Sequence, residues 1–132
     1  MLYLLDTNTC ILAMRGKPNV VSKMATVSPS DVVVSSITCY ELYIGVEKCS
    51  IPQRERSKVD LFVSALVHAT FDNQAATHAA SLRAALESLG QMIGPYDILI
   101  AGHAVALGLT IVTSNTNEFS RIPGLPIENW NV

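Results

Sequence analysis

Short apolar runs alternate along this chain with longer stretches in which apolar residues recur at helical spacing. The apolar run at 2–5 and the β-branched runs at 32–34 and 110–113 are typical of strands buried on both faces, and a weaker strand-like piece lies around 69–71. Helical patterns are predicted from residue 7 to about 16, from about 19 to 27, over 37–49, from 52 to about 66, from 73 to 89, from 95 to 107, and briefly after residue 114.

Strands that alternate with helices indicate a parallel sheet covered by helices on both faces. We find no internal repeat, low-complexity tract or linker that would divide the chain. The prediction is therefore an α/β fold, a three-layer α/β/α sandwich with a mostly parallel central sheet, in a single domain over 1–132.

Composition narrows the classes of function. Hydrophobic residues make up 49% of the 132 residues and the mean hydropathy is +0.33, yet polar residues interrupt every apolar stretch before the roughly 18 residues that a membrane span needs. No secretory signal pattern opens the chain, so we expect a cytoplasmic protein without a membrane. The three cysteines are scattered and odd in number, which favours free thiols over a disulfide framework. With a net charge of −2, the chain would have to hold any nucleic acid locally.

Three carboxylates stand where ligands bind in such sheets, beyond the carboxyl ends of strands and at the starts of helices. Asp6 follows the first strand, Glu41 lies on an apolar helix face, and Asp97 lies in the first turn of a helix. Neither Glu41 nor Asp97 has a Lys or Arg three or four positions further on, where a helical ion-pair partner would sit. Each carboxylate also has a structural explanation that involves no ligand. Asp6 could cap the following helix, Glu41 could pair with a distant arginine, and Asp97 could complement the helix dipole.

Asn115 and Glu118 extend this set of oxygen ligands. Their spacing of three residues is that of a capping box, so the structural alternative is that Glu118 caps the start of a helix. Taken together, hard oxygen ligands of this kind suit Mg²⁺ or Mn²⁺. His68, His78 and His103 show no metal-binding spacing, and the chain has no Walker A loop, dinucleotide fingerprint or nucleophile elbow.

Several short motifs occur in a specific order: Asp6-Thr7-Asn8, Glu41-Leu42, Gly94-Pro95-Tyr96-Asp97 and Thr113-Ser114-Asn115. With them the chain resembles the PIN-domain ribonucleases over nearly its whole length, and most of all the VapC toxins of bacterial type II toxin–antitoxin pairs. The resemblance implies that Asp6, Glu41 and Asp97 bind Mg²⁺ or Mn²⁺, with Asn115 or Glu118 in the fourth position. Many PIN domains have Asp at the position of Asn115. Because the amide of Asn115 is neutral, the site of this chain carries less negative charge.

The resemblance further implies a metal-dependent endoribonuclease that hydrolyses phosphodiester bonds in RNA, with the anticodon region of a tRNA as an expected target. It also implies a VapB-type antitoxin partner and a homodimer. Two rival functions remain at this point. Asp6-Thr7-Asn8-Thr9 mimics the nucleophile motif of haloacid-dehalogenase-like phosphatases, although Asn8 replaces the second Asp. Alternatively, the carboxylates only cap helices and pair with arginines in a non-catalytic RNA- or protein-binding module.

Overall fold

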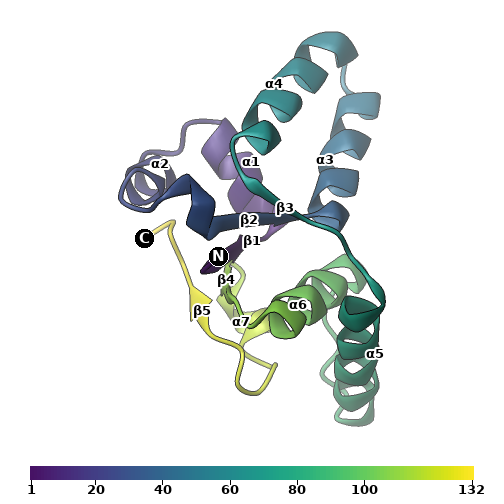
Figure 1. Ribbon diagram of the computed structural model, residues 1–132. Helices are drawn as coiled ribbons and strands as arrows, with labels where there is room; N and C mark the ends of the chain where they lie inside the picture. The colour runs from purple at the N-terminus through teal and green to yellow at the C-terminus, as the bar shows by residue number, and fades with distance from the viewer.

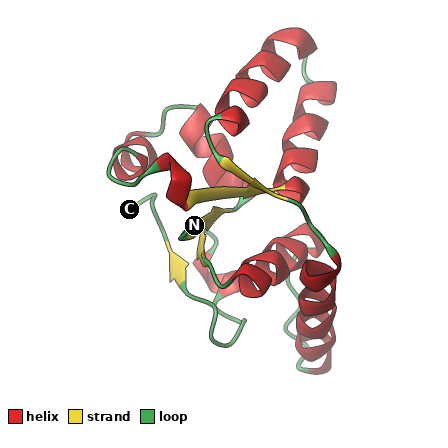
Figure 2. Ribbon diagram, in the orientation of Figure 1, coloured by secondary structure: helices red, strands yellow, loops and turns green.

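A five-stranded sheet forms the centre of the computed structural model, which describes all 132 residues (Figures 1 and 2). The strands lie in the order β3-β2-β1-β4-β5, and every neighbouring pair is parallel. Their bounds are β1 Tyr3–Leu5, β2 Val32–Ser35, β3 Val67–Ala69, β4 Thr110–Val112 and β5 Ile127–Glu128. The predicted parallel α/β architecture is confirmed, and the sheet is parallel throughout.

Seven α-helices cover the two faces of this sheet: α1 Thr7–Met14, α2 Pro18–Met24, α3 Ser36–Lys48, α4 Pro52–Ser64, α5 Asn73–Ser88, α6 Pro95–Leu107 and α7 Thr116–Phe119. A short 3₁₀ turn, Pro29–Asp31, precedes β2. In Figure 1 the helices α1 to α4 gather on one side of the sheet, with α3 and α4 as a hairpin, and α5, α6 and α7 on the other. No helix combines the length and the apolar character that a membrane span requires.

Alternation along the strands divides the core into two clusters, one on each face of the sheet. Leu4, Val33 and Ile111 pack with α5 and α6 on one face. Their neighbours Leu5 and Val34 pack with α1 to α4 on the other face. All these side chains are fully buried, because helices cover both faces of a parallel sheet. This explains why the strands appear in the sequence as uninterrupted apolar runs.

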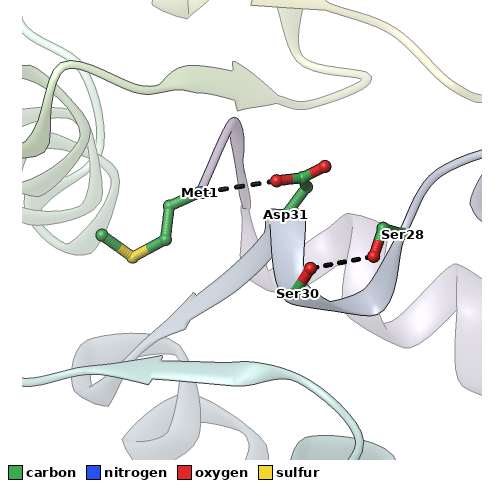
Figure 3. Close-up of polar contacts among 4 residues, drawn as sticks. All are labelled: Met1, Ser28, Ser30 and Asp31. Carbon is green, nitrogen blue, oxygen red and sulfur yellow. Dashed lines mark hydrogen bonds and ion pairs between the residues drawn. The ribbon is translucent and has the colours of Figure 1, made fainter.

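The amino terminus is held against the start of β2 (Figure 3). The terminal ammonium of Met1 lies 3.3 Å from Oδ1 of Asp31, and the hydroxyls of Ser28 and Ser30 hydrogen-bond nearby at 2.8 Å. An exposed ion pair of this kind contributes under about 1 kcal/mol. The backbone N–H of Leu2 also donates to the carbonyl of Asp31, and this bond leads directly into the pairing of β1 with β2.

Two strands differ from the predictions. The third strand lies at Val67–Ala69 rather than around 69–71, because its register is set by pairing with β2, where Val33 faces Val67. β5 was not predicted at all. It has only two residues, Ile127–Glu128, and exists through its pairing with β4, so no local pattern could reveal it.

Candidate active site

Asp6 lies at the carboxyl end of β1, and its side chain is only 4% exposed. Its Oδ1 accepts a 2.8 Å hydrogen bond from the backbone N–H of Thr9, so the predicted role as the cap of α1 is confirmed. The carboxylate also hydrogen-bonds the side chain of Thr113, which directly follows β4. Burial nevertheless raises the pKa of Asp6, because desolvation outweighs these bonds. The capping hydrogen bond therefore holds the Asp6 carboxylate at the ends of two central strands, where burial disfavours its charged form.

Glu41 lies in the middle of α3, half-buried, and faces α1. The hydroxyl of Thr7 donates a 2.7 Å hydrogen bond to its Oε1, and the same hydroxyl lies 3.2 Å from that of Thr38. A hydroxyl has one proton, and the shorter contact with the charged acceptor is the stronger one. Thr7 thus orients Glu41.

Asp97 lies in the first turn of α6 and is half-buried. Burial is the largest of the effects that raise its pKa from 3.8 to about 6, and the negative charges of Asp6, Glu118 and Glu41 add to it. A side-chain hydrogen bond with Glu118 raises the pKa further, and such a bond between two carboxyls needs a proton on one of them. These influences place the four acidic side chains, which come from distant parts of the sequence, in one neighbourhood.

Asn115 stands at the start of α7, but the capping box predicted from its spacing with Glu118 is wrong. The side chain of Asn115 makes no capping hydrogen bond, and its Nδ2 instead donates to Oε2 of Glu118 at 2.9 Å. Its backbone N–H donates to the hydroxyl of Thr113 at 2.9 Å, which leaves no role for Glu118 as the reciprocal cap. Asn115 therefore orients Glu118, and Glu118 in turn contacts Asp97.

No basic side chain neutralises this acidic cluster, which we define as Asp6, Glu41, Asp97 and Glu118. The four ion pairs of the structure all lie elsewhere, so the alternative in which an arginine pairs with Glu41 is wrong. The carboxylates also do not converge on a single position that a metal ion could occupy. No group of three or more His, Cys, Asp and Glu side chains is arranged so that it could hold a metal ion as it stands. The cluster has the charge and the donor atoms for a cation but an open geometry.

Comparison with known proteins identifies this arrangement. The family model described as PIN domain matches residues 3–125. The chain belongs to the PIN-domain family. Among its relatives is the protein named tRNA(fMet)-specific endonuclease VapC of Salmonella typhimurium, which is 44% identical over 128 residues, or 97% of each chain. A protein of the same name from Shigella flexneri is 41% identical and covers 98% of each chain.

Solved structures agree with this assignment. A crystal structure of DNA-bound VapBC from Salmonella typhimurium contains a chain that superposes with a TM-score of 0.92 at 45% identity, covering 98% of this chain and 99% of that one. The resemblance to VapC proteins is confirmed. The haloacid-dehalogenase-like alternative is not supported, because a PIN domain accounts for almost the whole chain.

Two side chains of this PIN domain that position its carboxylates were not among the predicted site residues. Thr7 binds Glu41, and Thr113 is fully buried between Asp6 and the backbone of Asn115. Thr113 could have been found, because a polar residue directly after a buried strand lies at the ligand-binding edge of the sheet. Thr7 could not, since its bond depends on the packing of α1 against α3.

The histidines of this PIN domain lie away from the acidic cluster. His103 is buried in α6, where Nδ1 lies 2.8 Å from the hydroxyl of Ser35 and the ring meets Phe71 edge to face. Burial lowers the pKa of His103, so the neutral ring is favoured. Nε2 of His68 lies 2.6 Å from the carbonyl oxygen of Val63. All three cysteines are free, as predicted.

Proposed function

We propose that this chain is a ribonuclease toxin that cleaves RNA with the help of Mg²⁺ or Mn²⁺ at the acidic cluster. The observation that carries the proposal is that four carboxylates, those of Asp6, Glu41, Asp97 and Glu118, lie in one neighbourhood and none of them forms an ion pair. A protein maintains such mutual repulsion at a cost, and sites of this kind are characteristic of function. The names of the relatives, which are ribonucleases and endonucleases, supply the reaction class.

The residues fit a hard divalent cation by their chemistry. Asp6, Asp97 and Glu41 offer carboxylate oxygens, the ligands that Mg²⁺ and Mn²⁺ prefer, and their negative charge is uncompensated. We assign these three as the metal ligands, with Glu118 or Asn115 at the fourth position. Because the present side-chain positions are open, the ligands must turn towards the ion when it binds. A bound cation would lower the pKa of water and offset negative charge on the phosphate.

The chain's own groups supply position and orientation. Asp6 is held at two points, by the backbone of Thr9 and the side chain of Thr113, so its place at the edge of the sheet is fixed. Thr7 holds the Glu41 carboxylate in an orientation from which it can accept a proton from an attacking water. Asn115 holds Glu118 against Asp97. Hydrogen bonds from neighbouring residues thus orient Asp6, Glu41 and Glu118, whereas Asp97 has no such bond from outside the cluster and can turn towards a cation.

The proposed substrate is a tRNA, cut in its anticodon region. Relatives at 44% and 41% identity carry the name tRNA(fMet)-specific endonuclease, which makes initiator tRNA the first target to test. Hydrolysis by water does not require the ribose 2′-hydroxyl, so the choice of RNA over DNA rests on these relatives.

The proposed protein partners are a VapB-type antitoxin and a second copy of the chain. A groove of about 630 Å³ runs between α1, α3 and α4, and Glu41 lies at its wall together with Ile11, Met14, Leu42, Val46 and Val59. An apolar antitoxin segment would cover these side chains, and a basic residue at its end would reach the acidic cluster. Related VapB–VapC pairs have been crystallised as complexes. Co-expression with a candidate VapB-type antitoxin, followed by copurification, tests this assignment.

Incubation of the purified chain with total RNA and Mg²⁺ or Mn²⁺, followed by sequencing of the new ends, tests the activity. The matched control is Asp6→Asn, because asparagine caps helices as well as aspartate does and the fold should survive. We expect discrete cleavage sites with the wild type and none with the variant. No metal-dependent cleavage by a folded wild type, or equal cleavage by Asp6→Asn, would contradict the proposed function.

A further inference from the structure

Two exposed tyrosines lie beside the acidic cluster. Tyr40 directly precedes Glu41 on α3, and Tyr96 directly precedes Asp97 on α6. Their side chains are large and partly apolar, yet 52% of Tyr40 and 40% of Tyr96 are exposed. We call them the tyrosine pair. Neither residue contributes to the buried core, so packing alone does not explain why aromatic rings stand at these positions.

The rings contact each other across the two helices. Their centroids are 5.7 Å apart with an interplanar angle of 67°, an edge-to-face arrangement, and the hydroxyl oxygens are 3.5 Å apart. The pair therefore bridges α3 and α6, the two helices that carry Glu41 and Asp97. In an edge-to-face pair the outer face of at least one ring stays free for a third aromatic partner.

The overall charge of the chain favours contacts with RNA that do not depend on charge. The net charge is −2, and the acidic cluster itself repels the phosphates that it is proposed to cut. Of the basic side chains near Glu41, Arg56 lies over the ring of Tyr43 and Lys58 contacts Glu55. Arg15 lines the same groove as Glu41 and makes no ion pair, so it remains available for a phosphate. Stacking of a nucleobase on an aromatic ring contributes about 1–3 kcal/mol per base and does not depend on charge.

We propose that the tyrosine pair is a stacking site for one unpaired nucleobase of the RNA, next to the phosphate that is cleaved. This inference rests on the proposed function and assigns a positioning role to Tyr40 and Tyr96 within the same site. A base stacked there would bring its own phosphate close to the acidic cluster, because the two rings meet between α3 and α6, the helices that carry Glu41 and Asp97. Unpaired bases, as in a tRNA anticodon loop, have the free faces that such stacking needs.

A second copy of the chain is the competing occupant of this surface. Tyr96 also borders a cleft of about 260 Å³ between α5 and α6, lined mainly by apolar side chains including Phe71, Ala80 and Leu99. If a homodimer covered this cleft and the tyrosine pair together, the rings would stabilise an interface instead of a base. The experiment must therefore measure RNA binding, cleavage and oligomeric state on the same variants.

The binding test uses an anticodon stem–loop RNA with 2-aminopurine at one loop position, because this fluorescent base is quenched when it stacks on an aromatic ring. Titrations with the free chain in EDTA need no catalysis, so they are independent of the proposed function. We expect quenching with the wild type, its loss in Tyr40→Leu and Tyr96→Leu, and its return in the two Tyr→Phe variants. Tyr43→Leu is the matched control on α3, because Tyr43 is occupied by Asp60 and Arg56.

The cleavage test separates positioning from folding. With Mn²⁺, KM for the stem–loop should rise about tenfold to a hundredfold in the leucine variants while kcat changes little, in keeping with the free energy of stacking one base. The salt dependence of binding should stay the same, because no phosphate contact is lost. Unchanged quenching and KM, or dissociation of a dimer with RNA binding intact, would overturn the stacking site. Absence of cleavage by the wild type despite normal quenching would instead refute the proposed function.

Discussion

Replacing Asp97 by asparagine keeps the size of the side chain and removes the charge that its surroundings oppose. The carboxyl has a pKa of about 6 in the folded chain, against 3.8 as the ordinary value. Between about pH 3.8 and about pH 6, the Asp97 carboxyl is therefore protonated more often in the folded state than in the unfolded state. It follows that stability falls as the pH rises through this range and that the full penalty is present above about pH 6.

The size of the penalty follows from the same two values. Their difference corresponds to about 3 kcal/mol at neutral pH before screening. Asp97 is only half-buried, so solvent reduces this to about 1–2 kcal/mol. Asparagine loses the favourable interaction of a negative charge with the start of α6, which is about 0.3–1 kcal/mol. It can, however, donate to Glu118 at any pH. We expect Asp97→Asn to be more stable than the wild type by about 1 kcal/mol at neutral pH.

Urea unfolding followed by circular dichroism, in EDTA at about pH 7.5 and about pH 4, measures this difference. At the lower pH the wild-type carboxyl is protonated and the gain should vanish. Glu47→Gln on the exposed side of α3 is the matched control and should change stability by less than about 0.5 kcal/mol. Asp97→Asn should also be inactive on RNA. Lower stability than the wild type at neutral pH, or an equal gain at both pH values, would refute the argument that repulsion is stored at Asp97.

Three further predictions address the positioning of the carboxylates, the helix packing and the metal. Thr7→Val removes the hydrogen bond to Glu41 and should lower kcat about tenfold, whereas Thr7→Ser should restore it; equal rates would contradict this. Gly102→Ala should lose about 1–3 kcal/mol in urea unfolding, because the new Cβ would lie 2.5 Å from Cα of Ala79 on α5. Gly45→Ala in α3 meets nothing within 4 Å and should be neutral or stabilising. Saturating Mn²⁺ should raise the Tm of the wild type by several degrees over EDTA, and no shift would contradict metal binding.

The sequence predicted most helices and the central strands because their signals are local. The apolar runs that became β1, β2 and β4 are contiguous, and Pro52, Pro95 and Gly108 mark helix ends where they were expected. The elements that differed depend on pairing between distant segments. β5 follows only from the partner strand β4, and the exact place of β3 follows from its register with β2.

The same distinction holds for the site. Glu41 and Asp97 stood out because neither has a base at helical spacing, which is visible in the sequence alone. The bonds that orient the carboxylates were not visible. Glu118 does not cap α7 because the hydroxyl of Thr113 already accepts from the backbone N–H of Asn115, and Thr7 reaches Glu41 only when α1 packs on α3. Side-chain partners across elements require the tertiary fold.

The position of β1 in the middle of the sheet has a consequence for synthesis of the chain. β1 precedes β2 and β3 in the sequence, yet its other neighbour, β4, and the edge strand β5 follow about a hundred residues later. When β1, β2 and β3 have been made, two of the five strands are still missing, and Asp6 and Glu41 are present before Asp97 and Glu118. The acidic cluster is therefore complete only once α7 has been added to the domain, and RNA cleavage by this chain requires nearly the whole fold.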